Sequence, residues 1–220
     1  MSMYLVFLGE LLLLFLLSKK LINYISQLLF WITKSKSITC YVLALLFLPG
    51  TFIHEVSHYC MAKILFVKTW GMTLIPEIEK TGIKLGSVQI SKSDPIRRFL
   101  IGAAPFFFGI LIIIGALFAV FHYSFYENPL LYVLAGYVVF EVGNTMFSSR
   151  KDMEGAITLL LFCILLGFLL YFFGFRAPLY EITPYTSSLL LQAEIFLSIP
   201  LSIDIGVIIL LSIIRNFTVQ

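Results

Sequence analysis

Two histidines and a glutamate near position 55 have the types and spacing of a metal site. The segment 49–62 reads Pro-Gly-Thr-Phe-Ile-His-Glu-Val-Ser-His-Tyr-Cys-Met-Ala. In a helix, residues four apart lie on one face, so the imidazoles of His54 and His58 can bind one metal ion together. Zinc lowers the pKa of a bound water to about 7, and a neighbouring carboxylate can then take its proton. The pattern predicts a hydrolytic zinc site with Glu55 as the general base.

The chain around this motif has the composition of a membrane protein. Of its 220 residues, 60% are hydrophobic and only 12% are charged, and the mean hydropathy is +1.01. Soluble domains carry about 25% charged residues, so a soluble fold is excluded. Ionisable groups inside a hydrophobic span are costly and usually functional. The setting therefore favours a functional site over histidines that only bond to neighbouring helices.

A catalytic zinc needs a third protein ligand and an open position for water. His122 is the only other histidine, and it lies at the far end of a later span. Acidic and polar residues near the end of the next span are better placed. If the helix there is continuous, their spacing of three or four forms one polar stripe that must face the bundle interior or water. These residues are Glu141, Asn144, Ser148 and Asp152.

The combination of motifs resembles the site-2 protease family of intramembrane zinc metalloproteases. That family has an HExGH or HExSH core in a membrane span, a small residue four positions beyond the second histidine, and an Asn-x7-Asp pattern at the end of a later span. The chain has Ser57 and Ala62 at the two small positions, and Asn144 and Asp152 reproduce the later spacing. The resemblance covers about residues 50–155, and the N-terminal segment and the last two spans add no motif.

The resemblance implies a role for each matching residue. It makes zinc the cofactor, Glu55 the general base and Asn144 a contact to the substrate backbone or the developing oxyanion. The implied zinc ligands are His54, His58 and Asp152.

The chain also departs from the family pattern. Phe147 and Ser149 stand where the family has prolines, and Glu154 lies in place of a glycine after the aspartate. Glu141 and Glu154 therefore stay open as rival third ligands. Two further alternatives are that Asp152 pairs with a neighbouring Arg or Lys, and that Asn144 makes an interhelical hydrogen bond.

Hydrophobic segments predict an all-α polytopic membrane protein with about six transmembrane helices. A bilayer core of about 30 Å needs roughly 20 apolar residues per helix. Met3–Leu17 is short, and Leu21–Ile32 is either an interfacial helix or part of a long first span. The remaining predicted spans are Ile38–Val67, interrupted at Pro49-Gly50, and about Ile96–His122, Leu130–Phe147, Gly155–Phe173 and Leu189–Ile214.

A stretch of mixed polarity, Lys68–Asp94, follows the HExxH segment. Its glycines and alternating patches predict a small insertion of short strands joined by turns. The chain is then divided into an N-terminal membrane anchor (1–36), a metalloprotease core (37–155) and C-terminal transmembrane helices (156–220).

The charged residues indicate how the chain is oriented in the membrane and argue against nucleic acid as a partner. The net charge of +3 is small and the basic residues lie between hydrophobic blocks, so nucleic acid is not an expected partner. The positive-inside rule places Lys68–Arg98 on the cytoplasmic side, with the N-terminal lysines as a misfit. We expect an integral multi-pass protein of the cell membrane.

Two classes of function fit these features. The first is a zinc-dependent endopeptidase that hydrolyses a membrane-associated protein or peptide. A helical substrate would have to unwind before cleavage, and a strand of Lys68–Asp94 could hold the unwound segment by pairing with it along the strand edge. The alternative is a non-peptidase membrane protein, such as a metal-binding transporter with an HExxH-like site. A transporter should carry polar residues along several spans, whereas the fifth predicted span is almost wholly apolar. The sequence gives no indication of the oligomeric state.

Overall fold

The computed structural model describes residues 2–79, 82–122, 129–147, 161–162, 165–174 and 179–218. It is mostly helical (79%). The long helices are α1 (Ser2–Thr33), α2 (Lys36–Leu46), α3 (Leu48–Ile64), α4 (Pro95–His122), α5 (Pro129–Thr145) and α7 (Leu179–Thr218). The strands are β1 (Thr69–Thr73), β2 (Glu77–Glu79), β3 (Gly82–Lys84) and β4 (Ser87–Ile90).

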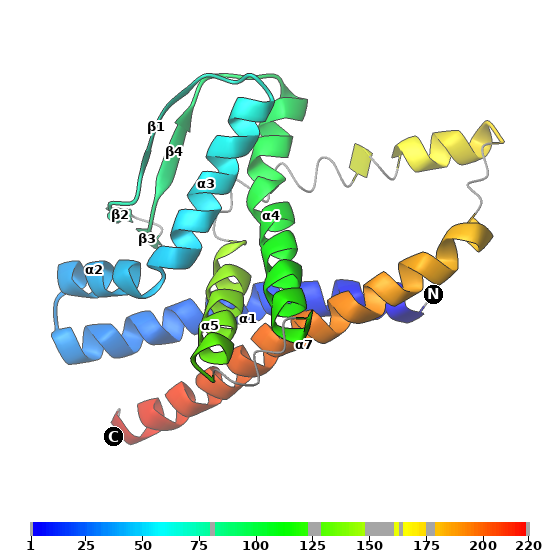
Figure 1. The fold of residues 1–220 in the computed structure, drawn as a ribbon. Coiled ribbons are helices and arrows are strands. Elements are labelled where there is room, and N and C mark those ends of the chain that lie inside the picture. The colour runs from blue at the N-terminus through cyan, green and yellow to red at the C-terminus, as the bar shows by residue number, and fades with distance from the viewer. Residues whose placement is uncertain are drawn as a thin grey trace.

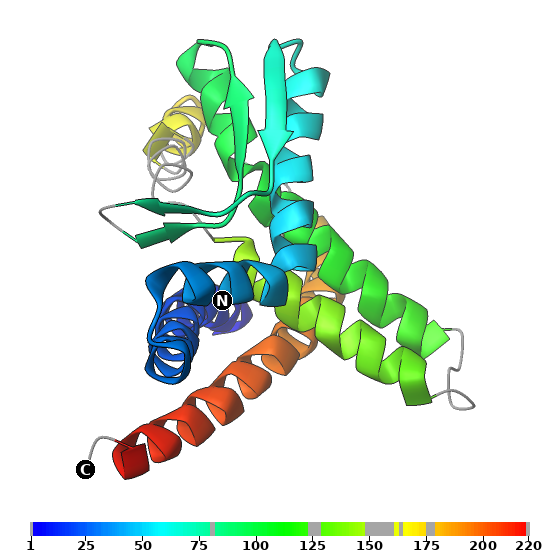
Figure 2. The ribbon, with the colours of Figure 1, turned by 90° about the vertical axis from the view of Figure 1, so that its left-hand side faces the viewer.

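The helices form two layers that meet around α5. In Figure 1, α3 and α4 stand side by side, and α1 and α7 cross beneath them. Figure 2 shows β1 and β4 lying along α3. Apolar side chains from four helices share one buried cluster, which contains Leu14 of α1, Ile113 of α4, Val139 of α5 and Leu197 of α7. Helices far apart in the sequence thus pack on a common core.

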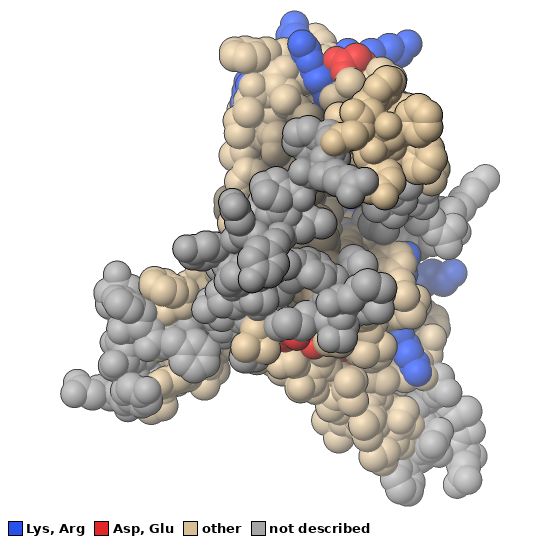
Figure 3. Space-filling model, turned by 90° about the vertical axis from the view of Figure 1, so that its right-hand side faces the viewer, with Lys and Arg blue, Asp and Glu red and all other residues tan. Residues whose placement is uncertain are grey.

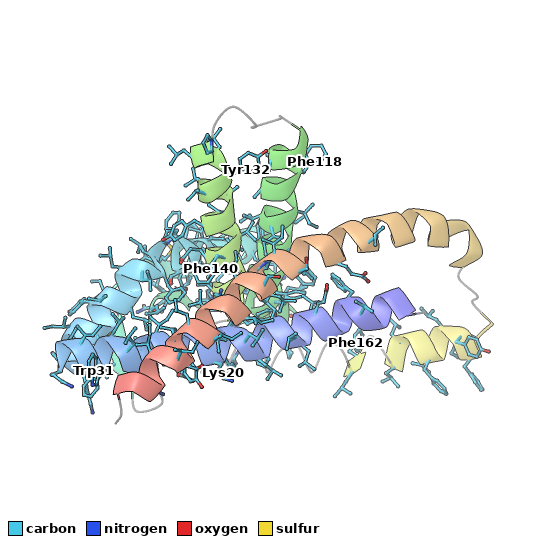
Figure 4. The ribbon with its side chains drawn as sticks, turned by 90° about the horizontal axis from the view of Figure 1, so that it is seen from below. Lys20, Trp31, Phe118, Tyr132, Phe140 and Phe162 are labelled. Atoms are coloured by element: carbon cyan, nitrogen blue, oxygen red, sulfur yellow. The ribbon has the colours of Figure 1, made fainter. Side chains whose placement is uncertain are left out.

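The predicted interruption near Pro49-Gly50 is confirmed as a sharp bend between α2 and α3. The two helices meet at 73° at a break of no more than four residues. Proline fits the first turn of a helix, where its missing N–H would have no helical partner, and Pro49 lies there in α3. Phe47 at the corner is fully buried and stacks on Phe140 of α5, whose position is labelled in Figure 4. The bend turns α3 inward, toward the other helices.

In the described part of the chain, three helical segments are long and apolar enough to cross a membrane: Gly9–Thr33, Pro95–Val120 and Leu197–Ile214. The α2–α3 pair counts as a fourth if it is one broken span. The prediction of about six transmembrane helices is therefore not confirmed. The first two hydrophobic segments form one continuous helix, and α5 has only 17 residues. In the predicted fifth span, residues 155–160 and 163–164 lie outside the described residues.

The exterior of the helical bundle is far more apolar than the surface of a soluble protein. Large apolar side chains are exposed on the outside of the bundle, among them Leu111 and Phe118 of α4 and Val133 of α5. Phe118 and Tyr132 are labelled in Figure 4, near the connection of α4 to α5. Polar residues such as Glu141 are fully buried instead. A lipid surrounding accounts for both observations, because exposed apolar groups are stable in it and polar groups are not.

The strands predicted within Lys68–Asp94 are present as two antiparallel pairs. β1 pairs with β4, with Thr69 opposite Ile90 and Thr73 opposite Ser87. β2 pairs with β3 further along the same hairpin. The backbone N–H of Ser91 donates to the Lys68 carbonyl at 2.9 Å and closes the hairpin where it joins the helices. The insertion thus folds back over α3 instead of extending away from it.

The start of α4 is fixed by Asp94. Its carboxylate accepts a hydrogen bond from the Arg97 backbone N–H at 3.0 Å and pairs with the Arg97 side chain at 3.1 Å. The first N–H groups of a helix lack helical partners, so an aspartate in this place caps the helix. The backbone hydrogen bond lowers the pKa of Asp94. Figure 3 shows Lys and Arg side chains gathered at this end of the molecule.

Candidate metal centre

The HExxH segment forms the middle of α3 and presents its polar side chains to the protein interior. His54, Glu55 and His58 are 4%, 6% and 9% exposed, respectively. Phe52 and Tyr59 of the same helix are exposed. The three ionisable groups are therefore removed from bulk solvent, in a place where an unused charge would be costly.

The two imidazoles face each other through the nitrogens that a metal would use. His54 Nε2 and His58 Nε2 are 3.1 Å apart, and the ring planes are nearly perpendicular at 85°. Two nitrogens bound to one tetrahedral zinc at about 2.0–2.1 Å are separated by about 3.3 Å. The observed separation is close to this value, so the pair fits two ligands of one zinc ion without rearrangement of α3.

The ring of His58 is held in one tautomer. Its Nδ1 lies 2.7 Å from the backbone carbonyl oxygen of Ile101 in α4. A carbonyl oxygen only accepts, so His58 Nδ1 carries the hydrogen and donates it. In the neutral ring, Nε2 then has a lone pair directed at His54. This is the tautomer that metal-binding histidines use, with the second nitrogen bonded to a carbonyl or carboxylate.

The described part of the chain does not supply a third ligand. Within it, no group of three His, Cys, Asp or Glu side chains is arranged to hold a metal, so Glu141 does not join the histidine pair. Asp152 and Glu154, the other two candidates, lie outside the described residues. His122 ends α4, 21 residues after Ile101, which corresponds to about 30 Å along the helix. This agrees with the expectation that His122 is remote from the site.

Glu141 has a different position from the one expected of a ligand. Its Oε2 accepts a hydrogen bond from the backbone N–H of Gly50 at 3.3 Å, in the first turn of α3. A carboxylate at a helix N-terminus satisfies an N–H without a helical partner and opposes the helix dipole. Gly50 permits the close approach, since a Cβ there would lie 2.6 Å from the Glu141 carbonyl oxygen. Glu141 thus holds the beginning of the HExxH helix against α5.

Asn144 is buried in a contact with α7. Its Nδ2 donates to the carbonyl oxygen of Phe140 at 3.0 Å and to Oδ1 of Asp204 at 2.8 Å. The interhelical hydrogen bond considered from the sequence is therefore present. An amide group has two hydrogens, and both are used. In this arrangement, Asn144 can donate to an oxyanion only after one of these bonds breaks.

Asp204 is the buried residue that sequence reasoning missed. It lies in the apolar part of α7 and is fully buried. The last span was expected to contribute no motif, because a single aspartate matches no spacing pattern. The available signal was its charge, since an acidic residue inside an apolar span is a functional candidate by itself. The structure gives it the role of orienting Asn144.

The strand insertion reaches the site at Gly86, in the turn between β3 and β4. A Cβ at this position would lie 2.9 Å from Glu55 Cγ, 3.1 Å from Glu55 Oε1 and 3.1 Å from Thr51 Cγ2. The backbone of the turn therefore lies directly against the Glu55 carboxylate. Residues 31 positions apart in the sequence meet here, and the insertion covers the general base predicted from the motif.

The first prediction concerns this contact. Gly86→Ala should displace the Glu55 carboxylate and lower the peptidase activity predicted from the sequence, without changing the predicted zinc content. Overpacking costs about 1–3 kcal/mol, which corresponds to roughly a 5- to 150-fold change in rate. Gly115→Ala is the control, because a Cβ at that position of α4 meets nothing within 4 Å. Equal activity of the two variants in a peptidase assay would contradict the prediction.

No family model, curated protein or solved structure matches this chain.

Proposed function

We propose that the chain is a membrane-embedded zinc-dependent endopeptidase. One observation carries the proposal: two buried imidazoles, with Nε2 atoms 3.1 Å apart, lie beside a buried glutamate in a bundle with an apolar exterior. The two Nε2 atoms share a hydrogen bond in the structure, and the same two nitrogens can bind one zinc ion. The proposed ligands are His54, His58 and Asp152.

The chain's own groups have separate tasks in the proposed reaction. Zinc, when bound, would lower the pKa of a water and polarise the scissile carbonyl. Glu55 takes the proton of the attacking water and returns it to the leaving amine. His54 and His58 would hold the metal through their Nε2 atoms, and the Ile101 carbonyl fixes the tautomer of His58. The low exposure of these groups strengthens their electrostatic interactions.

The position of the strand insertion supports a membrane-associated polypeptide as the substrate. A helical substrate must unwind before its peptide bonds can be attacked, since its backbone groups are internally bonded. The β1–β4 pair is the whole of its sheet in the described part of the chain, so each strand has an edge that can pair with an extended segment. The backbone at Gly86 lies against Glu55, so β4 begins beside the proposed general base.

The second prediction tests the proposed ligand set. The wild-type protein, purified in detergent, should hold about one zinc per chain. Asp152→Asn should lower zinc retention by at least about tenfold, because an amide lacks the charge that offsets zinc's and is a poor ligand. Glu141→Gln and Glu154→Gln are the matched controls and should keep the metal. Zinc is measured by mass spectrometry after dialysis against a weak chelator.

Two results would distinguish the zinc site itself from the family resemblance that suggested Asp152 as its third ligand. Full zinc in Asp152→Asn, together with zinc loss in Glu141→Gln or Glu154→Gln, would leave a zinc site with a different third ligand. Absence of zinc from the wild-type protein under these conditions would end the proposal of a metallopeptidase.

A metal-binding transporter is the second candidate, and the buried acidic residues are the observation that favours it. Glu141 and Asp204 are fully buried on α5 and α7, so polar groups extend beyond the HExxH helix. Both already have partners in Gly50 and Asn144, respectively, which is the reason the peptidase is preferred. Zinc uptake into liposomes that contain the protein, unaffected by Glu55→Gln, would favour the transporter.

A further inference from the structure

We propose that Pro105 is a positioning residue for the metal centre. By removing a backbone hydrogen from α4, it leaves the Ile101 carbonyl available to fix the tautomer of His58. This inference rests on the proposed zinc site, because the selected tautomer matters only if His58 Nε2 binds a metal.

The basis is the hydrogen-bond pattern of α4. In an α-helix, each N–H donates to the carbonyl four residues earlier, so the donor for Ile101 would be the residue at position 105. That residue is proline, which has no N–H, and it lies inside the helix. Ile101 is 2% exposed, so water does not readily supply the missing donor. A buried carbonyl in this state needs another donor.

His58 supplies that donor. Its Nδ1 lies 2.7 Å from the Ile101 oxygen, a short hydrogen bond between groups 43 residues apart. The bond comes from the helix beside α4, and the packing around it is close, since Ile101 and Ala62 of α3 belong to one buried cluster. The proline and the histidine are therefore complementary: one residue leaves an acceptor without a donor, and the other donates to it.

The consequence concerns the other nitrogen of the ring. With the hydrogen on Nδ1, Nε2 of neutral His58 keeps its lone pair toward His54. If an N–H at position 105 took the Ile101 carbonyl, His58 would lose its preference for this tautomer. Metal affinity would then fall, because part of the population would have to move a proton before binding. Loss of such a supporting hydrogen bond typically lowers metal affinity 10- to 100-fold.

The experiment is Pro105→Ala, examined first without metal. The chain has three histidines, so ¹⁵N-histidine labelling gives a simple NMR spectrum, and the His58 signals are assigned by their loss in His58→Gln. In the wild-type protein, His58 should carry its hydrogen on Nδ1. In Pro105→Ala, we expect a mixture of tautomers. Zinc affinity, measured by competition with a chromophoric chelator, should fall by about tenfold or more.

Pro200→Ala is the matched control. Pro200 is a second buried proline inside a long helix, but it packs on Gly143 of α5 and not on the histidine pair. This variant should leave the His58 tautomer as in the wild type. It thus separates the specific effect of position 105 from the general effect of removing a helical proline.

The inference would be overturned by any of three results. The His58 tautomer could be the same in Pro105→Ala and the wild type, it could change equally in Pro200→Ala, or it could change in Pro105→Ala without a loss of zinc affinity. A wild-type protein that binds no zinc would instead defeat the proposed function, and the NMR comparison would still decide whether Pro105 controls the tautomer.

Discussion

Replacement of either histidine of the pair is expected to abolish zinc binding. His54→Ala and His58→Ala should each reduce the zinc content from about one per chain to less than about a tenth, since too few protein donors then remain for tight binding. Each side chain directs its Nε2 atom at the other, at a distance of 3.1 Å. Zinc is measured by mass spectrometry on protein purified in metal-free buffer.

His122→Ala is the control for this experiment. His122 is the third histidine of the chain and ends α4, far from the Ile101 carbonyl that contacts His58. Its replacement should leave the zinc content unchanged, which also excludes zinc that is bound nonspecifically by imidazoles. Equal zinc in the wild type and in both His54→Ala and His58→Ala would refute the zinc site.

Replacement of the glutamate should separate metal binding from catalysis. Glu55→Gln is expected to keep about one zinc per chain and to lose proteolytic activity by at least about 100-fold, because general base catalysis contributes roughly 10²–10⁴-fold. The amide has nearly the same shape but cannot take a proton from water. Casein in detergent is a suitable probe, since an unfolded chain needs no unwinding before cleavage. The products are followed by electrophoresis and mass spectrometry.

The matched control is Glu77→Gln, an exposed glutamate of β2 in the insertion. It should keep full activity, which shows that loss of one carboxylate from this part of the protein has no general effect. Casein cleavage by wild type that stops on zinc removal and returns on its addition completes the assignment. Undiminished cleavage by Glu55→Gln would exclude Glu55 as the base.

Much of the architecture follows from residue types and their order. The apolar segments predicted the long helices, Pro49-Gly50 predicted the bend between α2 and α3, and the glycine-rich alternation after Lys68 predicted the strands. These features depend on the conformational preferences and hydrophobicity of short segments, and they need no contact between distant residues. The number of spans was less certain, because an apolar run does not show whether it continues through polar residues. Lys19 and Lys20 were such a case, and α1 runs through them as one helix.

The HExxH spacing also determined that His54 and His58 share a helix face, since four residues make about one turn. It did not determine which contacts hold the two histidines and their helix in position. That depends on the Ile101 carbonyl, on the carboxylate of Glu141 at the start of α3, and on the turn at Gly86.

The sequence by itself thus determined the membrane class, the order of helices and strands, and the position of His54 and His58 on one helix face. Tertiary structure alone decided that Glu141 caps a helix, that Asn144 bonds to Asp204, and that Gly86 covers Glu55. The physical reason is separation along the chain: Gly50 and Glu141 are 91 residues apart, and Asn144 and Asp204 are 60 apart. A buried polar group forms a hydrogen bond with whichever partner the packed helices bring close to it. The residues next to that group in the sequence do not show which distant residue the partner is.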